Sequence, residues 1–220
     1  RDALASLLQQ LGDRPGILVG TQILAKGHDL PHLTLVVVVG VDEGLFSADF
    51  RAGEKLAQQL IQVSGRAGRA QKPGQVWLQT HHPEHPLLNT LINGGYHAFA
   101  ESDLAQRHAA GFPPFTHLAL LRAEAQHVEA ATAFLHAAKA VLAASTRERS
   151  VGPCAAPALQ GPLPAPMPRR AGMHRMQLVL TSTTRRDLHA LLDAGLPLIY
   201  TLPEARKVRW SLDVDPLDLY

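Results

Sequence analysis

The chain has 220 residues, 46% of them hydrophobic, and a formal net charge of only +2. This length suits one large domain or two small ones, and a charge so close to neutral does not by itself indicate a nucleic-acid-binding protein. No apolar run reaches the roughly 18 residues of a membrane span, and no signal segment opens the chain. The single cysteine, Cys154, excludes an internal disulfide and a cysteine-based zinc site, and we therefore expect a cytoplasmic protein.

The first half of the chain has the pattern of an α/β fold. Leucines at helical spacing predict a helix over residues 2–11. The apolar runs at 17–20 and 34–40 are rich in β-branched residues and do not alternate with polar ones, which predicts two buried parallel strands. Further elements follow in chain order: a helix over 52–63, a turn at 72–74, an alternating strand over 75–80, and a mostly helical segment over 86–108 that is interrupted at 93–95.

The Gly-Phe-Pro-Pro-Phe segment at 111–115 is the predicted domain boundary, because two prolines end a helix and stiffen a linker. We therefore predict domains at 1–110 and 111–220. The second domain is expected to hold, in order, a strand over 116–124, a helix over 128–144, a weak strand over 150–158, a mobile loop over 161–172, a strand over 173–181, a helix over 184–200 and a strand over 208–214. This β-α-β-β-α-β order is typical of the ferredoxin-like α+β fold.

The most informative motif is Gln-Val-Ser-Gly-Arg-Ala-Gly-Arg at residues 62–69. Arg66 and Arg69 are always charged and bind phosphate oxygens through two donors at once. The small residues between them let the backbone approach a bulky anion. A transferring phosphoryl group needs such donors for its developing charge. The competing interpretation is a helix end with two solvated arginines.

A second motif lies between the two predicted strands and contains Thr21, Lys26, Gly27 and Asp29. Ligands of open α/β sheets bind at the carboxyl ends of the strands, where these residues fall. Thr21 is a candidate for holding one DNA backbone phosphate without reading sequence. Lys26 suits the same strand or the nucleotide, and an ordinary surface lysine is the alternative.

Together these motifs resemble the fifth and sixth motifs of the second RecA-like lobe of superfamily-two helicases. The runs at 44–51, 79–86 and 208–216 resemble more specifically the PriA family of replication-restart helicases (primosomal protein N′). The resemblance covers nearly the whole chain and is thin across 145–175. It implies a partial RecA-like lobe and a ferredoxin-like domain, as the C-terminal part of an ATP-dependent 3′-to-5′ DNA helicase. Such a helicase recognises stalled replication forks and initiates primosome assembly.

The resemblance also assigns roles to the motif residues. Arg66 or Arg69 would be the arginine finger at the ATP phosphates, with Gln62 positioning the nucleotide or the attacking water. Asp29 would accept from a ribose hydroxyl, although family members differ there and a turn aspartate is an equal alternative. The full nucleotide-facing set is Gly27, Asp29, Gln62, Gly65, Arg66 and Arg69, and the DNA-facing set is Thr21, Lys26 and Arg51.

Basic residues gather elsewhere, and a solvated face is the ordinary interpretation of each cluster. One cluster holds Arg169, Arg170, His174 and Arg175. Another possible set, Arg185, Arg186, Arg206, Lys207 and Arg209, suits a pocket for DNA phosphates or for the acidic tail of the single-stranded DNA-binding protein.

The resemblance implies ATP and Mg²⁺ as cofactors of the complete protein. The phosphate loop and the acidic magnesium-binding box that would hold them are absent from this sequence. Zinc is expected only in a missing upstream segment, and the fragment alone is expected to be inactive. His81, His82 and His85 are close in sequence, but prolines interrupt them and no four-ligand set is complete, so we predict no metal site. Asp42 and Glu43 follow the second predicted strand as coupling residues or as a solvated loop.

Two rival functions remain open. The first is a non-catalytic fork-binding scaffold of the same family that lacks ATP turnover. The second is another superfamily-two enzyme that acts on RNA, which the run at 44–51 and the ferredoxin-like tail disfavour. The partners that the resemblance implies are single-stranded and forked DNA, the tail of the single-stranded DNA-binding protein and primosome proteins, and we expect no membrane contact.

Overall fold

The computed structural model describes residues 15–21, 33–47, 49–65, 67, 74–149, 156–217 and 219, with the backbone alone at 147–149. Two compact units emerge: Arg1–Ser47 with Ala52–Glu101, and Ala48–Arg51 with Ser102–Tyr220. The predicted helix over 2–11 and most of the weak strand over 150–158 lie outside the described residues. Within the described part of the chain, no helix is both long enough and apolar enough to cross a membrane.

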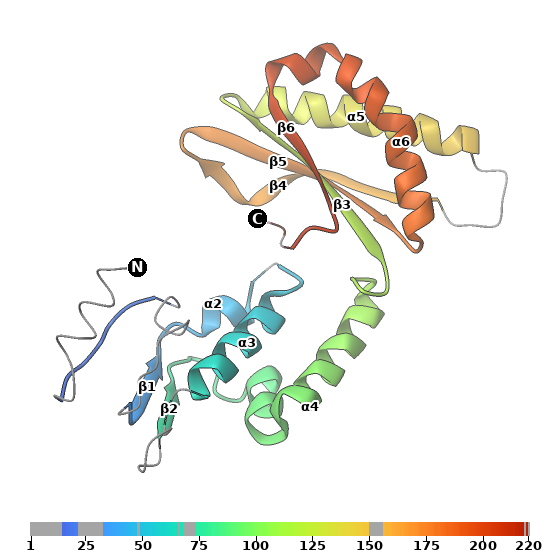
Figure 1. Ribbon diagram of the computed structural model, residues 1–220. Coiled ribbons are helices and arrows are strands. Elements are labelled where there is room, and N and C mark those ends of the chain that lie inside the picture. Colours follow the sequence, from blue (N-terminus) through green and yellow to red (C-terminus); the bar gives the residue numbers. More distant parts are fainter. Residues whose placement is uncertain are drawn as a thin grey trace. The chain divides into compact units, whose positions relative to one another are not determined.

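The first unit is built on a pair of parallel strands, β1 (Leu35–Val38) and β2 (Gln75–Leu78). Between them in sequence lie the short helix α2 (Asp42–Leu45) and α3 (Ala52–Ser64), as Figure 1 shows. Helix α3 is amphipathic, and its buried residues recur at helical spacing. Three of them, Leu56, Ala57 and Leu60, join the core of this unit, whose other members are Val41, Leu88, Leu91 and Phe99.

The prediction of two buried strands in the first unit is partly wrong. Residues 15–21 have no regular secondary structure, and Ile17 and Val19 are 91% and 88% exposed. Strand β1 is parallel as expected, but it pairs with the later strand β2 and alternates between half-buried and exposed residues. Val38 and Leu78 pack on the core, whereas their neighbours Val37 and Trp77 are exposed. A branched apolar run favours a strand but does not say how many of its faces are covered.

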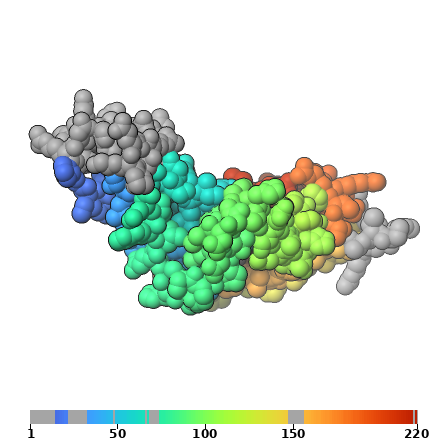
Figure 2. All heavy atoms as spheres, turned by 90° about the horizontal axis from the view of Figure 1, so that it is seen from below, coloured from blue at the N-terminus to red at the C-terminus, as the bar shows by residue number. Residues whose placement is uncertain are grey.

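Helix α4 (Pro86–Ala110) follows β2, and its interruption confirms the prediction at 93–95. Gly95 has φ 71° and ψ −171°, a backbone conformation that leaves the helix and that glycine adopts without a side-chain clash. In the space-filling view of Figure 2 the green atoms of α4 lie at the surface. Contacts divide the two units at Glu101/Ser102, inside this helix, and the domain boundary at 110/111 stays a prediction.

The second unit contains β3 (His117–Ala125), α5 (Val128–Arg149), β4 (Ala158–Arg170), β5 (Met173–Ser182), α6 (Arg185–Thr201), the 3₁₀ helix η2 (Pro203–Lys207) and β6 (Arg209–Val214). The strands form one antiparallel sheet in the order β4-β5-β3-β6. The other strands and helices of this unit follow one another as the sequence predicts, whereas β4 lies later in the chain than the weak strand expected at 150–158.

The core of the second unit lies between the sheet and helices α5 and α6. Strand β3 turns Ala119, Leu121 and Ala123 toward it, and Phe134 of α5 is fully buried there. Residues between these in sequence point to the other face of the sheet, because side chains alternate along a strand. On that face Arg122 pairs with Asp213 at 2.8 Å across to β6.

The predicted mobile loop over 161–172 is wrong, because most of it is strand β4. The prediction depended on the proline-rich composition of the segment, whose prolines are Pro162, Pro164, Pro166 and Pro168. Strand β4 is at the edge of the sheet, and an edge strand tolerates proline because one of its two sides needs no N–H donors for a ladder. The strand ends in a two-residue turn, Ala171–Gly172, in which both residues have positive φ.

The contact between α5 and α6 yields a test of the core. A Cβ at Gly195 lies 2.5 Å from Leu142 Cδ2, so we expect G195V to lower the free energy of unfolding by about 1–3 kcal/mol through overpacking. L142A alone leaves a cavity and costs about 2–5 kcal/mol. In the double variant the valine fills that cavity, so the combined loss in chemical denaturation should be smaller than the sum. Additive losses would contradict the contact.

Candidate functional site

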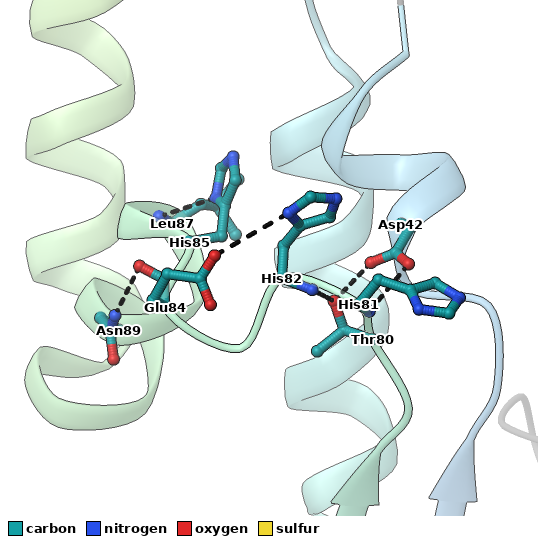
Figure 3. A network of polar contacts seen from close by, with 8 residues as sticks. All are labelled: Asp42, Thr80, His81, His82, Glu84, His85, Leu87 and Asn89. Atoms are coloured by element: carbon teal, nitrogen blue, oxygen red, sulfur yellow. Dashed lines mark hydrogen bonds and ion pairs between the residues drawn. The ribbon is translucent and has the colours of Figure 1, made fainter.

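The carboxyl ends of β1 and β2 bring polar residues together. Parallel strands end at the same edge of a sheet, so the loops that follow Val38 and Leu78 are neighbours. Asp42 begins α2 after the first strand, and Thr80 and His81 follow the second. Figure 3 shows these side chains pointing toward one another. This edge is where open α/β sheets bind ligands.

Asp42 is the centre of this network. Its carboxylate accepts a hydrogen bond from the Thr80 hydroxyl and another from the His81 backbone N–H at 3.0 Å. The Thr80 hydroxyl in turn accepts from the His82 N–H at 2.9 Å. The hydrogen bond from Thr80, followed by that from the His81 backbone, lowers the pKa of Asp42. The side chain is therefore ionised at neutral pH and ties the two loops together.

The histidines of this region pack against one aromatic ring. His82 and His85 contact Phe46 edge-on, with ring centroids 4.7 and 5.6 Å apart. His85 Nδ1 accepts from the Leu87 N–H at 3.2 Å, at the start of α4. His82 Nδ1 lies 3.9 Å from Glu84 Oε1, a contact drawn in Figure 3. Among the described residues, no group of three or more histidine, cysteine or acidic side chains is arranged to hold a metal ion.

The carboxyl end of α3 presents Gln62 and Gly65. Val63 is 8% exposed and anchors the end of the helix, while Gln62 and Gly65 are exposed. The Gly65 N–H donates to the Ile61 carbonyl at 3.0 Å, which completes the last turn. Arg66 and Arg69 lie outside the described residues, as do Lys26, Gly27 and Asp29. The predicted assembly of this motif around a nucleotide therefore stays a prediction.

The residues predicted to face DNA that the structure describes, Thr21 and Arg51, lie in separate segments. Thr21 is exposed and ends the described segment 15–21. The Arg51 backbone N–H donates to Asp49 Oδ1 at 3.1 Å, and Asp49 is 4% exposed. Next to it Phe50 stacks on Phe112, with ring centroids 5.4 Å apart, which gives this aromatic ring a packing role.

The structure does not bring the five basic residues of the predicted pocket together. Arg185 and Arg186 begin α6, whereas Arg206 and Lys207 follow it in η2 and Arg209 begins β6. Helix α6 has 17 residues, which corresponds to a length of about 25 Å. The residues therefore form two groups at opposite ends of α6. Arg185 Nη2 pairs with Asp215 Oδ2 at 2.9 Å, an exposed contact.

Sequence reasoning singled out Asp42 but missed Thr80 as its partner. The two residues are 38 positions apart, and the spacing alone does not connect them. The available signal was a polar residue after each of two strands, combined with the knowledge that those strands are parallel neighbours. The sequence pattern does not show that the strand at 34–40 has the strand at 75–80 as its neighbour, and only the pairing of β1 with β2 reveals this.

Comparison with known proteins matches both halves of the chain. Residues 108–217 match the family model of the primosomal protein N C-terminal domain. Residues 1–71 match the model of the helicase conserved C-terminal domain. The two matches flank most of α4, and they cover the predicted nucleotide-binding motifs on one side and the four-stranded sheet on the other.

Relatives named "Replication restart protein PriA" are similar along nearly the whole chain. The protein from Haemophilus influenzae is 48% identical over 206 residues, which are 92% of this chain and 27% of the relative. The Bacillus subtilis protein is 34% identical over 98% of this chain and 26% of its own length. The Synechocystis protein is 40% identical over 92% and 23%. The chain thus spans about a quarter of the length of these relatives.

The Asp42 network generates a pH prediction. Because the folded-state pKa of Asp42 is lowered from its ordinary 3.8, its stabilising effect is present above pH 3.8 and is lost as the pH falls through the folded-state pKa. We expect D42N to be less stable than wild type at pH 7, and the difference in melting temperature to shrink as the pH falls below 3.8. E43Q, at the exposed neighbouring position, is the control. An unchanged difference across this range would contradict the role of the ionised carboxylate.

Proposed function

This chain belongs to the PriA family of replication restart proteins, and we propose that it provides part of the second motor lobe and a DNA-binding C-terminal domain of an ATP-dependent 3′-to-5′ DNA helicase. The observation that carries this proposal is the presence, in one chain, of a helicase C-terminal match and a primosomal C-terminal match. In this proposal the complete protein recognises stalled forks and initiates primosome assembly for replication restart.

The motor part of the proposal depends on Arg66 and Arg69. One of them approaches the phosphates of an ATP bound with Mg²⁺ on the other lobe, and Gln62 and Gly65 line the same side. The exposed position of Gln62 and Gly65 at the end of α3 supports this arrangement, because the motif continues directly from that helix end. Charge that develops on the transferring phosphoryl group is stabilised by the guanidinium.

Coupling between the nucleotide and DNA is proposed to pass through the loops after β1 and β2. Asp42 joins these loops through the Thr80 hydroxyl and the His81 N–H, so a displacement of one loop moves the other. Thr21, Lys26 and Arg51 are proposed DNA contacts, and Gly27 and Asp29 face the nucleotide. Contacts of this kind to phosphates give binding that is largely independent of sequence and weakens with salt.

We assign the C-terminal domain to the ferredoxin-like fold. The antiparallel order β4-β5-β3-β6 and the packing of α5 and α6 on the sheet support this assignment. The two basic groups at the ends of α6 support separate contacts, one through Arg185 and Arg186 and one through Arg206, Lys207 and Arg209. The proposed ligands are forked DNA and the acidic tail of the single-stranded DNA-binding protein.

The first test replaces Arg69 in a full-length protein that contains this chain. We expect R69A to lower DNA-stimulated ATP hydrolysis by about a thousandfold or more, the range for an arginine finger, and to leave DNA binding unchanged. R66A, measured in parallel, identifies which arginine is the finger. K55A, which removes an exposed cation from α3, is the control for loss of charge.

Near-normal turnover in both arginine variants would overturn the motor assignment. Absence of ATP hydrolysis in the unaltered protein, with fork binding retained, would favour the non-catalytic scaffold. Stronger binding of structured RNA than of forked DNA would favour the RNA-acting alternative.

The second test removes residues 112–220 from the same full-length protein. We expect fork affinity to fall much more than ATP affinity, because the basic groups of α6, η2 and β6 are lost while the nucleotide motifs remain. Fluorescence anisotropy with a labelled fork and with a labelled ATP analogue measures the two affinities. Equal loss of both would show that the domain acts as a structural support for the motor.

A further inference from the structure

The basic cluster at the end of the β4–β5 hairpin separates into residues of two kinds. Arg175 is engaged in the fold, because its Nε pairs with Glu124 Oε1 at 3.0 Å and its side chain is 11% exposed. Arg169 and Arg170 are exposed, and neither guanidinium has a partner among the residues that the structure describes. Arg169 is paired with His174 across the hairpin, next to the terminal turn. The cluster therefore combines one arginine that the fold holds in an ion pair with two exposed arginines at the hairpin end.

A bulge immediately before these arginines presents an apolar side chain. Pro164 is paired with Met176 and Arg169 with His174, so residues 165–168 of β4 stand opposite Arg175 alone. Ala165, at the start of the bulge, is 4% exposed, whereas Met167 is 47% exposed. Met167 lies between Pro166 and Pro168, whose rings fix the backbone φ on both sides. The methionine is thus held out from the sheet on a backbone with little freedom.

The hairpin end is a narrow projection of the sheet. The last paired residue of β3 is Ala125, opposite His174, so the turn at Ala171–Gly172 extends beyond this central strand. In Figure 1 the orange hairpin projects from the other strands of its unit. A projecting two-stranded ribbon fits a concave partner, and the grooves of DNA admit such a ribbon.

The outer edge of β4 disfavours a peptide as the partner. A peptide that extends a sheet needs free N–H groups along the edge strand. Four prolines over 162–168 remove the N–H group at every second residue of this stretch. The positive charge of Arg169 and Arg170 then favours a polyanion that is recognised by side chains, and the phosphate backbone of DNA has this property.

We propose that the β4–β5 hairpin end is a contact for branched DNA, in which Arg169 and Arg170 bind backbone phosphates and Met167 packs against the base pair exposed at the branch point. Apolar side chains such as methionine contact unstacked base steps in many DNA-bending proteins. The identity of the ligand as DNA rests on the proposed function, whereas the place of the contact rests on the hairpin itself. This contact is separate from the basic groups at the ends of α6.

The test compares hairpin variants of the full-length protein on a fork and on a linear duplex of equal length. R169A/R170A removes two charges, and we expect a loss in affinity for both DNAs together with a decrease of about 2 in the slope of log K against log salt, near 0.9 for each phosphate contact. M167Q keeps the size of the side chain but makes it polar. It should lower the preference for the fork over the duplex and leave the salt slope unchanged.

A matched control carries the same change in net charge at another place. A133E/A140E adds two negative charges on exposed positions of α5, so its net charge equals that of R169A/R170A. We expect this control to retain the wild-type salt slope and fork preference. Circular dichroism melting of each variant verifies that the fold is kept.

Three outcomes would overturn the proposal. Wild-type affinity and salt slope in R169A/R170A would exclude the arginine contacts, and equal effects of R169A/R170A and A133E/A140E would reduce them to overall charge. If R169A/R170A lost binding of an acidic peptide but kept its affinity for the fork, the hairpin would be assigned to a protein partner. In each case, fork binding and ATP hydrolysis by the unaltered protein would still support the proposed function. Failure of the unaltered protein to bind forks would overturn both the proposed function and the hairpin contact.

Discussion

The parallel pairing of β1 and β2 is the constraint on which the first unit depends. It places two loops at one edge of the sheet, and the Asp42 carboxylate joins them through the Thr80 hydroxyl and the His81 N–H. Both donors stabilise the charged form of Asp42, and this is why its pKa is lowered. The histidines beyond Thr80 then continue the same connection to Phe46 and to the start of α4.

The second unit is organised differently, through a sheet whose two faces have different chemistry. Small and apolar residues of β3 face α5 and α6, and Gly195 lets Leu142 approach α6 closely. On the opposite face Arg122 and Arg175 are held by Asp213 and Glu124. Cations that the fold has already paired are poorer candidates for ligand binding, and Arg185 at the start of α6 is itself paired with Asp215. The exposed Arg169 and Arg170 at the hairpin end are therefore the stronger candidates.

The sequence was sufficient for elements with a strong local period. Helix α3, strand β2 and the break at Gly95 follow from residue spacing and from glycine, and the elements of the second unit other than β4 were also predicted correctly. It was insufficient where the outcome depends on a distant partner. The strand expected at 17–20 is absent, and the bond between Asp42 and Thr80 joins segments that only the pairing of β1 with β2 brings together. The roles of Arg66 and Arg69 stay predictions.

Strand β4 shows that one composition can have opposite structural meanings. Proline at alternate residues indicates a loop if the segment is judged by itself, because each ring removes a hydrogen-bond donor. At a sheet edge the donors that face solvent are not needed by the ladder, so the same residues are accepted in a strand. The missing donors also protect the edge against pairing with another strand. The prolines therefore disfavour pairing of another strand with the outer edge of β4, and they hold Met167 exposed beside Arg169 and Arg170. This combination suits recognition by side chains.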